Sequence, residues 1–156
     1  MIIPTYNNER TLADVVNSVL EYCQDVILVD DGSTQETKDI IKNFEDRVSL
    51  ITLDENKGKG TALQVGFKKA TELGLRYAIT IDSDGQHFPD DLILFLDKIK
   101  DNPDAMILGA RNMEQEGIPG KSSFGHKFSN FWFWVETGLR VPDTQTGYRL
   151  YPLKHV

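Results

Sequence analysis

The sequence contains very little cysteine and no long apolar run. Cys23 is the single cysteine among 156 residues, so the chain cannot form an internal disulfide or a cysteine zinc cluster. It falls on the apolar side of an expected helix, where an inert, packed thiol is favoured over a reactive one. No apolar stretch approaches the ~18 residues of a membrane span, and no signal peptide is visible. We therefore expect a cytoplasmic protein, with contact to the inner face of a membrane left open.

Basic residues are also scarce. Lys and Arg number 17 against 24 Asp and Glu, which gives a net charge of −7. A general nucleic-acid binder needs a basic surface, so we expect no nucleic-acid partner. A phosphorylated ligand is still compatible with this charge, because a bound metal ion reverses the local sign.

Short apolar runs alternate with amphipathic stretches along most of the chain. The apolar runs predict strands at 1–4, 25–30, 48–53, 77–81 and 104–109, and the amphipathic stretches predict helices at 9–23, 33–45, 61–73 and 89–100. Continuous apolar strands that alternate with helices are typical of a Rossmann-like α/β fold, in which helices cover both faces of a mostly parallel sheet.

The pattern changes after residue 109. Residues 110–123 are rich in Gly, Pro and charge, which predicts a mobile loop. A helix is expected at 124–139, and a short strand or loop at 143–151. The chain begins inside its first expected strand and stops without a closing element. We therefore expect a single domain over 1–156 that is truncated at both ends.

The segment Asp82-Ser-Asp84 follows the fourth expected strand and is the strongest chemical signal. Two carboxylates so close together repel each other unless a positive charge lies between them. Mg²⁺ and Mn²⁺ take oxygen ligands and share them with phosphates. Open α/β sheets bind ligands at the carboxyl ends of their strands. The segment therefore predicts a site for a metal ion and a nucleoside diphosphate.

Two further loops at the same edge of the sheet offer groups that suit a nucleoside. In the first, Tyr6 can lie against a base, and Asn7 or Glu9 can contact the base edge or the ribose. The alternative is that the loop's polar residues serve the start of the following helix. In the second loop, Asp31 is a candidate acceptor for a nucleobase N–H. Ser33 is expected to cap the next helix, in a capping box with a glutamate three residues later.

A third loop, Asn56-Lys-Gly-Lys-Gly-Thr61, pairs lysines with glycines before a helix. This composition suits an anion close to exposed backbone N–H groups, with Lys59 as the phosphate partner. A tight turn without a ligand explains the glycines equally well. The loop is not a P-loop, because Gly60 follows Lys59 where a P-loop has Ser or Thr.

Other interpretations of the paired acids fail at particular residues. A calcium loop beginning at Asp82 needs a bidentate Glu at its twelfth position, where Ile93 stands. A haloacid-dehalogenase-like phosphatase remains an alternative, although that family places its acidic motif after the first strand and has Thr where this chain has Gln86. A dinucleotide-binding site has no support, since no Gly-x-Gly-x-x-Gly follows the first strand.

Taken together, these loops resemble those of the family 2 inverting glycosyltransferases with a GT-A fold. The matching segments are Ile2-Ile-Pro-Thr-Tyr-Asn-Asn-Glu9, Val29-Asp-Asp-Gly-Ser33, Asn56-Lys-Gly-Lys-Gly60 and Asp82-Ser-Asp84, in the family's order. Asp143-Thr-Gln-Thr-Gly-Tyr-Arg149 is similar to a segment of the polyprenyl-phosphate and dolichol-phosphate branch. The absence of a Gln-x-x-Arg-Trp motif disfavours a polysaccharide synthase.

The resemblance implies roles for particular residues. It implies a nucleoside pocket lined by Pro4, Tyr6, Glu9 and Asp31. It also implies Mg²⁺ or Mn²⁺ on Asp82 and Asp84, with Gln86 as a further ligand, and Arg111 near the phosphates. The implied reaction moves a sugar from a UDP- or GDP-linked donor to a lipid-phosphate or glycan acceptor, with inversion at the anomeric carbon.

The acceptor decides which further residues are needed. A hydroxyl acceptor needs a general base, for which Asp143 is the candidate. A polyprenyl phosphate is already anionic, and Arg149 or Lys121 then matters more as an anion partner. A fragment that binds a nucleotide sugar without catalysis is the alternative function.

Aromatic side chains gather on one face of the helix expected at 124–139. Packing against the domain is the simpler interpretation. The alternative is an interfacial helix, because aromatic and basic residues suit the headgroup zone of a membrane. Peripheral membrane contact is therefore a second expectation.

Overall fold

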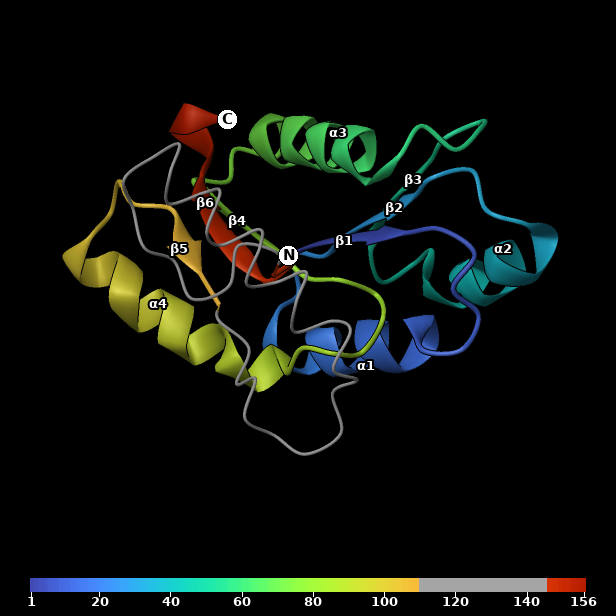
Figure 1. Cartoon of the computed structure of the whole chain (residues 1–156), viewed down its shortest axis with the longest axis horizontal. Helices are drawn as coiled ribbons and strands as arrows, with labels where there is room; N and C mark the ends of the chain where they lie inside the picture. The colour runs from blue at the N-terminus through green and yellow to red at the C-terminus, as the bar shows by residue number, and fades with distance from the viewer. Residues whose placement is uncertain (110–145) are drawn as a thin grey trace, which may run out of the picture.

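A central sheet of six strands organises the part of the chain that the structure, a computed structural model, describes: residues 1–109 and 146–156 (Figure 1). The strands are β1 (Ile2–Thr5), β2 (Ile27–Asp30), β3 (Ser49–Thr52), β4 (Tyr77–Thr80), β5 (Ile107–Leu108) and β6 (Arg149–Pro152). Their order across the sheet is β3-β2-β1-β4-β6-β5. The strands β1 to β4 are parallel to one another, and β6 runs antiparallel between β4 and β5. The predicted α/β fold with a mostly parallel sheet is confirmed.

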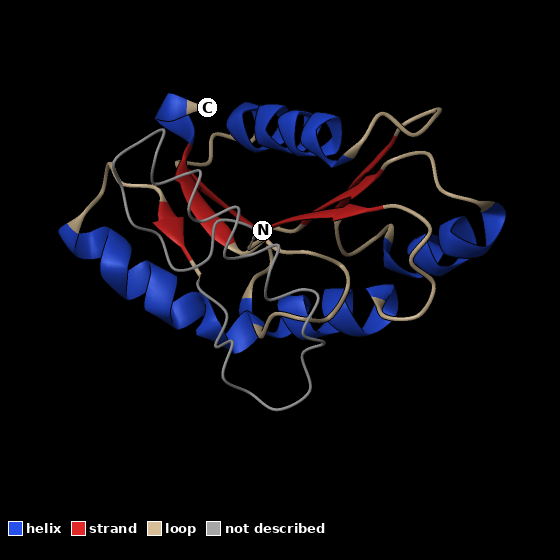
Figure 2. Cartoon of the chain, in the orientation of Figure 1, coloured by secondary structure: helices blue, strands red, loops and turns tan. Residues whose placement is uncertain are grey.

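Helices cover both faces of this sheet (Figure 2). The helices α1 (Leu12–Tyr22), α2 (Gln35–Ile41) and α4 (Leu92–Asp101) lie on one face, and α3 (Lys59–Glu72) lies on the other with the short turn η3 (Leu153–His155). Alternate residues of one strand contact the helices on opposite faces of the sheet, because successive side chains of a strand point to opposite faces. Ile3 packs with the α1 layer, and Ile2 packs with the α3 layer.

The helix α3 lies very close to the strand beneath it. A Cβ on Gly66 would lie 2.6 Å from Cγ2 of Ile2. Only a residue without a side chain permits this approach, so Gly66 sets the distance between helix and sheet. The same approach brings the first turn of α3 to the edge of the sheet where β1 and β4 end.

The helix boundaries differ most from expectation around α2. The α-helix stops at Ile41 and continues as a short 3₁₀ turn, η1 (Lys42–Phe44). Ser33 does not cap it, which corrects the expected capping box: Thr34 holds the N-cap position and makes no side-chain cap bond. The Ser33 hydroxyl instead accepts the backbone N–H of Asn7 at 3.1 Å. The Ser33 hydroxyl thus pairs with the distant loop after β1 and not with the helix that follows it.

The helix α4 and the strand β5 also differ from their expected bounds. A 3₁₀ turn, η2 (Pro89–Asp91), precedes α4, so proline opens the turn as expected but the α-helix begins three residues later. The strand β5 is shorter than its apolar run suggests. Cys23 is partly buried against the core, as expected of an inert thiol.

Several expectations fall outside the described residues. They are the mobile loop at 110–123, the helix at 124–139, and the residues Arg111, Lys121 and Asp143. Among the helices that are described, none combines the length and apolar character that crossing a membrane requires.

Candidate active site

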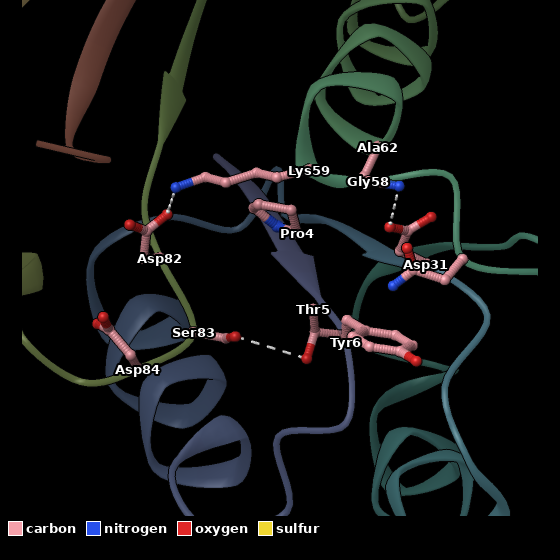
Figure 3. A pocket seen from close by; sticks show the side chains of 11 residues that line it. Pro4, Thr5, Tyr6, Asp31, Gly58, Lys59, Ala62, Asp82, Ser83 and Asp84 are labelled. Carbon is pink, nitrogen blue, oxygen red and sulfur yellow. Dashed lines mark hydrogen bonds and ion pairs between the residues drawn. The ribbon is translucent and has the colours of Figure 1, made fainter. Parts of the chain in front are cut away.

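A cavity of about 290 Å³ opens beyond the carboxyl ends of β1 and β4 (Figure 3). Along the chain the sheet grows from β1 to β3 on one side, and β4 then starts the other side. The position between β1 and β4 is thus the switch point of the fold, where open α/β sheets bind their ligands. The lining residues are Pro4, Thr5, Tyr6, Asp31, Asn56, Gly58, Lys59, Ala62, Asp82, Ser83 and Asp84.

The loop after β1 supplies an aromatic ring to the cavity. Pro4 is buried within the strand, whereas Tyr6 is 50% exposed and lines the opening. The next residue, Asn7, has a φ of +47° and turns the chain away from the cavity. Its side-chain oxygen accepts the N–H of Thr34 at 2.8 Å, which ties this loop to the start of α2. Asn7 does not line the cavity, so its nucleotide contact stays a prediction.

Glu9 also binds the α2 region. Its Oε1 accepts the Thr37 hydroxyl at 2.6 Å and the Thr34 hydroxyl at 3.5 Å. The bond from Thr37 is the main reason why the pKa of Glu9 is lowered from its usual value. Glu9 is outside the cavity lining, and its predicted contact with a nucleotide is untested.

Asp31 has a structural role that the sequence did not indicate. Its side chain is almost wholly buried, and its two oxygens accept the backbone N–H groups of Lys57 and Gly58, each at 2.8 Å (Figure 3). Gly32, with a φ of +71°, lets the neighbouring chain pass, since a Cβ there would lie 2.6 Å from the N of Asn56. Asp31 therefore fixes the Lys-Gly loop against β2. Each oxygen keeps a second lone pair, which can accept a hydrogen bond from a base N–H.

Lys59 is the first residue of α3, and its side chain reaches across to the end of β4 (Figure 3). Its Nζ lies 2.5 Å from Oδ1 of Asp82. The lysine side chain is 52% exposed and that of Asp82 is 23% exposed. The N-terminus of α3 adds partial positive charge at the same place, because the first backbone N–H groups of a helix have no partner within it.

Asp82 packs closely against the segment that precedes β6. A Cβ on Gly147 would overlap the Asp82 carboxylate, so Gly147 provides the space that the carboxylate occupies. The carbonyl of Gly147 in turn accepts the hydroxyl of Thr80 at 2.7 Å. The sequence pattern indicates no role for this glycine beyond its position in the Asp143–Arg149 segment.

Asp84 lies on an exposed turn that is anchored to α1. The carbonyl of Ser83 accepts hydrogen bonds from the Asn8 side-chain amide and the Thr11 hydroxyl, both at 2.6 Å. The Asp84 carboxylate accepts the N–H of Gln86 at 3.0 Å. Gln86 is exposed on this turn and does not line the cavity.

The donor set fits a hard divalent cation. Asp82 and Asp84 offer carboxylate oxygens at one cavity, which is what Mg²⁺ or Mn²⁺ needs when phosphates and waters supply the other ligands. Within 1–109 and 146–156, no group of three or more His, Cys, Asp or Glu could hold a metal by itself. Phosphate oxygens and water would complete the coordination of a metal held by Asp82 and Asp84.

The Thr146–Arg149 segment leads into β6 and lies beside β4. Arg149 Nε donates to the carbonyl of Thr146 at 2.7 Å, and Arg149 is not among the cavity residues. Tyr148 is buried, its hydroxyl donates to the carbonyl of Pro89 at 3.4 Å, and burial raises its pKa. The predicted anion-binding role of Arg149 is untested.

Comparison with known proteins gives a consistent picture. The model of the glycosyl transferase family 2 matches residues 1–153. The UDP-N-acetylglucosamine–dolichyl-phosphate N-acetylglucosaminyltransferase of Methanococcus voltae is 34% identical, over 97% of this chain and 68% of the relative. The human dolichyl-phosphate beta-glucosyltransferase is 31% identical, over 97% of this chain and 53% of the relative. The chain thus spans between half and about two thirds of these relatives.

Among solved structures, TarS 1-349 of S. aureus in complex with UDP-GlcNAc superimposes with a TM-score of 0.65. The two are 21% identical, and the match covers 97% of this chain and 44% of the other. At this identity the likeness concerns the fold.

Proposed function

The chain belongs to glycosyl transferase family 2 and has the GT-A fold, and from this premise we propose that it moves a sugar from a nucleoside-diphosphate sugar to a polyprenyl phosphate, with inversion. One observation carries the proposal. A single cavity at the switch point gathers an aromatic ring, a lysine at a helix N-terminus and two carboxylates. The family match and the position of Asp82 after β4 leave the phosphatase alternative without support.

The donor would lie along the cavity from β2 to β4. Its base would stack on the half-exposed ring of Tyr6 and hydrogen-bond to Asp31. The diphosphate would then reach Lys59 and the first turn of α3. A UDP-linked donor is favoured over a GDP-linked one, because the methanococcal relative is named for UDP-N-acetylglucosamine.

Asp82 and Asp84 would hold Mg²⁺ or Mn²⁺, with Gln86 as a further ligand. The ion, when bound, would neutralise the negative charge that develops on the departing diphosphate. Lys59 and the N-terminus of α3 would add positive potential at the same phosphates. Asp82 and Asp84 would also fix the donor's orientation relative to the acceptor.

The acceptor is proposed by analogy with the two relatives described above, both of which are named for dolichyl phosphate. A lipid phosphate is anionic near pH 7, so its oxygen can attack the anomeric carbon without a general base. Arg149 would then attract this phosphate, and Asp143 would act as a base for a hydroxyl acceptor alone. Because such an acceptor resides in lipid, we also propose that transfer takes place at a membrane surface.

A transfer assay tests the proposal. The purified chain would be incubated with UDP-N-acetylglucosamine, Mn²⁺ and a short polyprenyl phosphate, and the product's anomeric configuration read by NMR. Transfer with inversion, absent from Asp84→Ala, is the expected result. If the wild-type chain binds UDP yet neither transfers nor hydrolyses the sugar, the non-catalytic alternative is correct.

A further inference from the structure

The ammonium of Lys59 and a divalent cation would compete for the same carboxylate. Lys59 Nζ lies 2.5 Å from Asp82 Oδ1, and both residues line the cavity (Figure 3). Asp82 has little room to turn away, because its carboxylate rests where a Cβ of residue 147 would otherwise lie. A metal shared by Asp82 and Asp84 would therefore bind next to the positive charge of Lys59.

Hydrogen bonds hold the backbone just before Lys59 in place, whereas the half-exposed Lys59 side chain can change its rotamer. Asp31 holds the N–H groups of Lys57 and Gly58 at 2.8 Å each, immediately before α3 begins. Half of the Lys59 side chain is exposed, and its ammonium is a compact charge on a flexible stem. A second anion placed in the cavity could thus draw the ammonium from Asp82 without any change in the helix.

We propose that Lys59 is an exchange residue: it pairs with Asp82 when no divalent cation is bound and transfers to the diphosphate when metal and nucleotide bind. The exchange, which rests on the proposed function, makes metal and nucleotide bind cooperatively. Metal alone must break the ion pair and leave the ammonium without a partner. The diphosphate supplies that partner, so each ligand favours the other through Lys59, and the coupling is reciprocal.

The exchange predicts effects of opposite sign in one variant. Lys59→Met frees Asp82 and removes a neighbouring positive charge, so Mn²⁺ alone should bind about two- to five-fold more tightly, the range of a partly exposed ion pair. The same variant lacks the charged partner of the diphosphate. UDP in the presence of saturating Mn²⁺ should therefore bind about ten-fold more weakly. A residue with a merely structural role would not shift the two affinities in opposite directions.

The test measures free Mn²⁺ by electron paramagnetic resonance, and UDP binding by calorimetry with Mn²⁺ or with EDTA. Lys68→Met is the matched control, since Lys68 is an exposed lysine of the same helix about 13 Å further along it. It should leave both affinities within two-fold of wild type. Lys59→Gln provides a second variant should Lys59→Met fold poorly.

Unchanged or weaker binding of Mn²⁺ alone by both Lys59 variants would overturn the exchange. The proposed function fails on a different result, which is that wild type shows no metal-dependent UDP binding or that Asp84→Ala retains it. Tighter Mn²⁺ binding by Lys59→Met together with weaker binding of UDP supports the exchange. Loss of both affinities to the same degree contradicts it.

Discussion

The Asp82 carboxylate rests against the backbone of Gly147, in the space that any side chain at position 147 would fill. The two residues lie next to the ends of neighbouring strands: Asp82 follows β4, and Gly147 precedes β6, which pairs antiparallel with β4. The segment before β6 thus sets where one of the two acids can point. The position of the candidate metal ligand depends on a residue far away in the sequence.

Gly147→Ala should weaken metal-dependent nucleotide binding. The added methyl would displace the Asp82 carboxylate or the β6 segment, and overpacking of this kind costs about 1–3 kcal/mol. We expect at least a ten-fold loss of UDP affinity in Mn²⁺, measured by calorimetry, and a lower midpoint of urea unfolding. Gly60→Ala adds the same methyl where no atom lies within 4 Å, so its unfolding midpoint should not fall. Wild-type affinity in Gly147→Ala would show that Asp82 is not positioned by this contact.

Asp31→Asn should release the Lys-Gly loop. The amide can accept one of the two backbone N–H groups but presents its own NH₂ to the other, which leaves a donor unpaired. The cost expected for an unsatisfied donor is about 1–3 kcal/mol. Hydrogen exchange should speed up at the amides of Lys57 and Gly58. The exposed Asp54 offers a control substitution to Asn, and equal exchange in both variants would contradict the proposed clamp.

The pKa of Glu9 should depend on Thr37. The Thr37 hydroxyl is the main cause of the lowered pKa, with Thr34 a smaller one. Because the folded-state pKa is depressed, the stabilisation is present above the unfolded value and is lost as the pH falls through the folded one. Thr37→Val should bring the pKa of Glu9 back towards its usual value of 4.5, measured by carboxyl NMR titration. Thr34→Val should move it less, and a larger effect at Thr34 would contradict this order.

The sheet and the gathering of loops could be predicted from sequence because both depend on local patterns. The run before Asp82 is mainly apolar, so a buried strand was expected, and parallel strands bring their carboxyl ends to one edge. Pro4, Tyr6, Asp31, Lys59, Asp82 and Asp84 do line one cavity there. Their roles toward a nucleotide or a metal remain predictions.

The remaining features depend on contacts between residues far apart in the chain. Spacing indicated Ser33 as a helix cap, but its hydroxyl is occupied by Asn7, whose loop lies 26 residues earlier. The Lys59–Asp82 ion pair joins the first turn of α3 to the segment after β4, and the composition of neither segment specifies its partner. The position of β6 between β4 and β5 also could not be predicted from local patterns, because tertiary packing decides which strands become neighbours.

The most direct test of the metal-dependent nucleotide site is a calorimetric titration of the chain with UDP, with and without Mn²⁺, alongside Asp84→Ala. Wild type should bind UDP at least ten-fold more tightly in Mn²⁺ than in EDTA, because Asp82 and Asp84 would bind the diphosphate through the ion. Asp84→Ala should lose this gain and keep its unfolding midpoint, since Asp84 is exposed. A wild-type affinity for UDP that is the same in Mn²⁺ and EDTA, or a full gain retained by Asp84→Ala, would contradict the account.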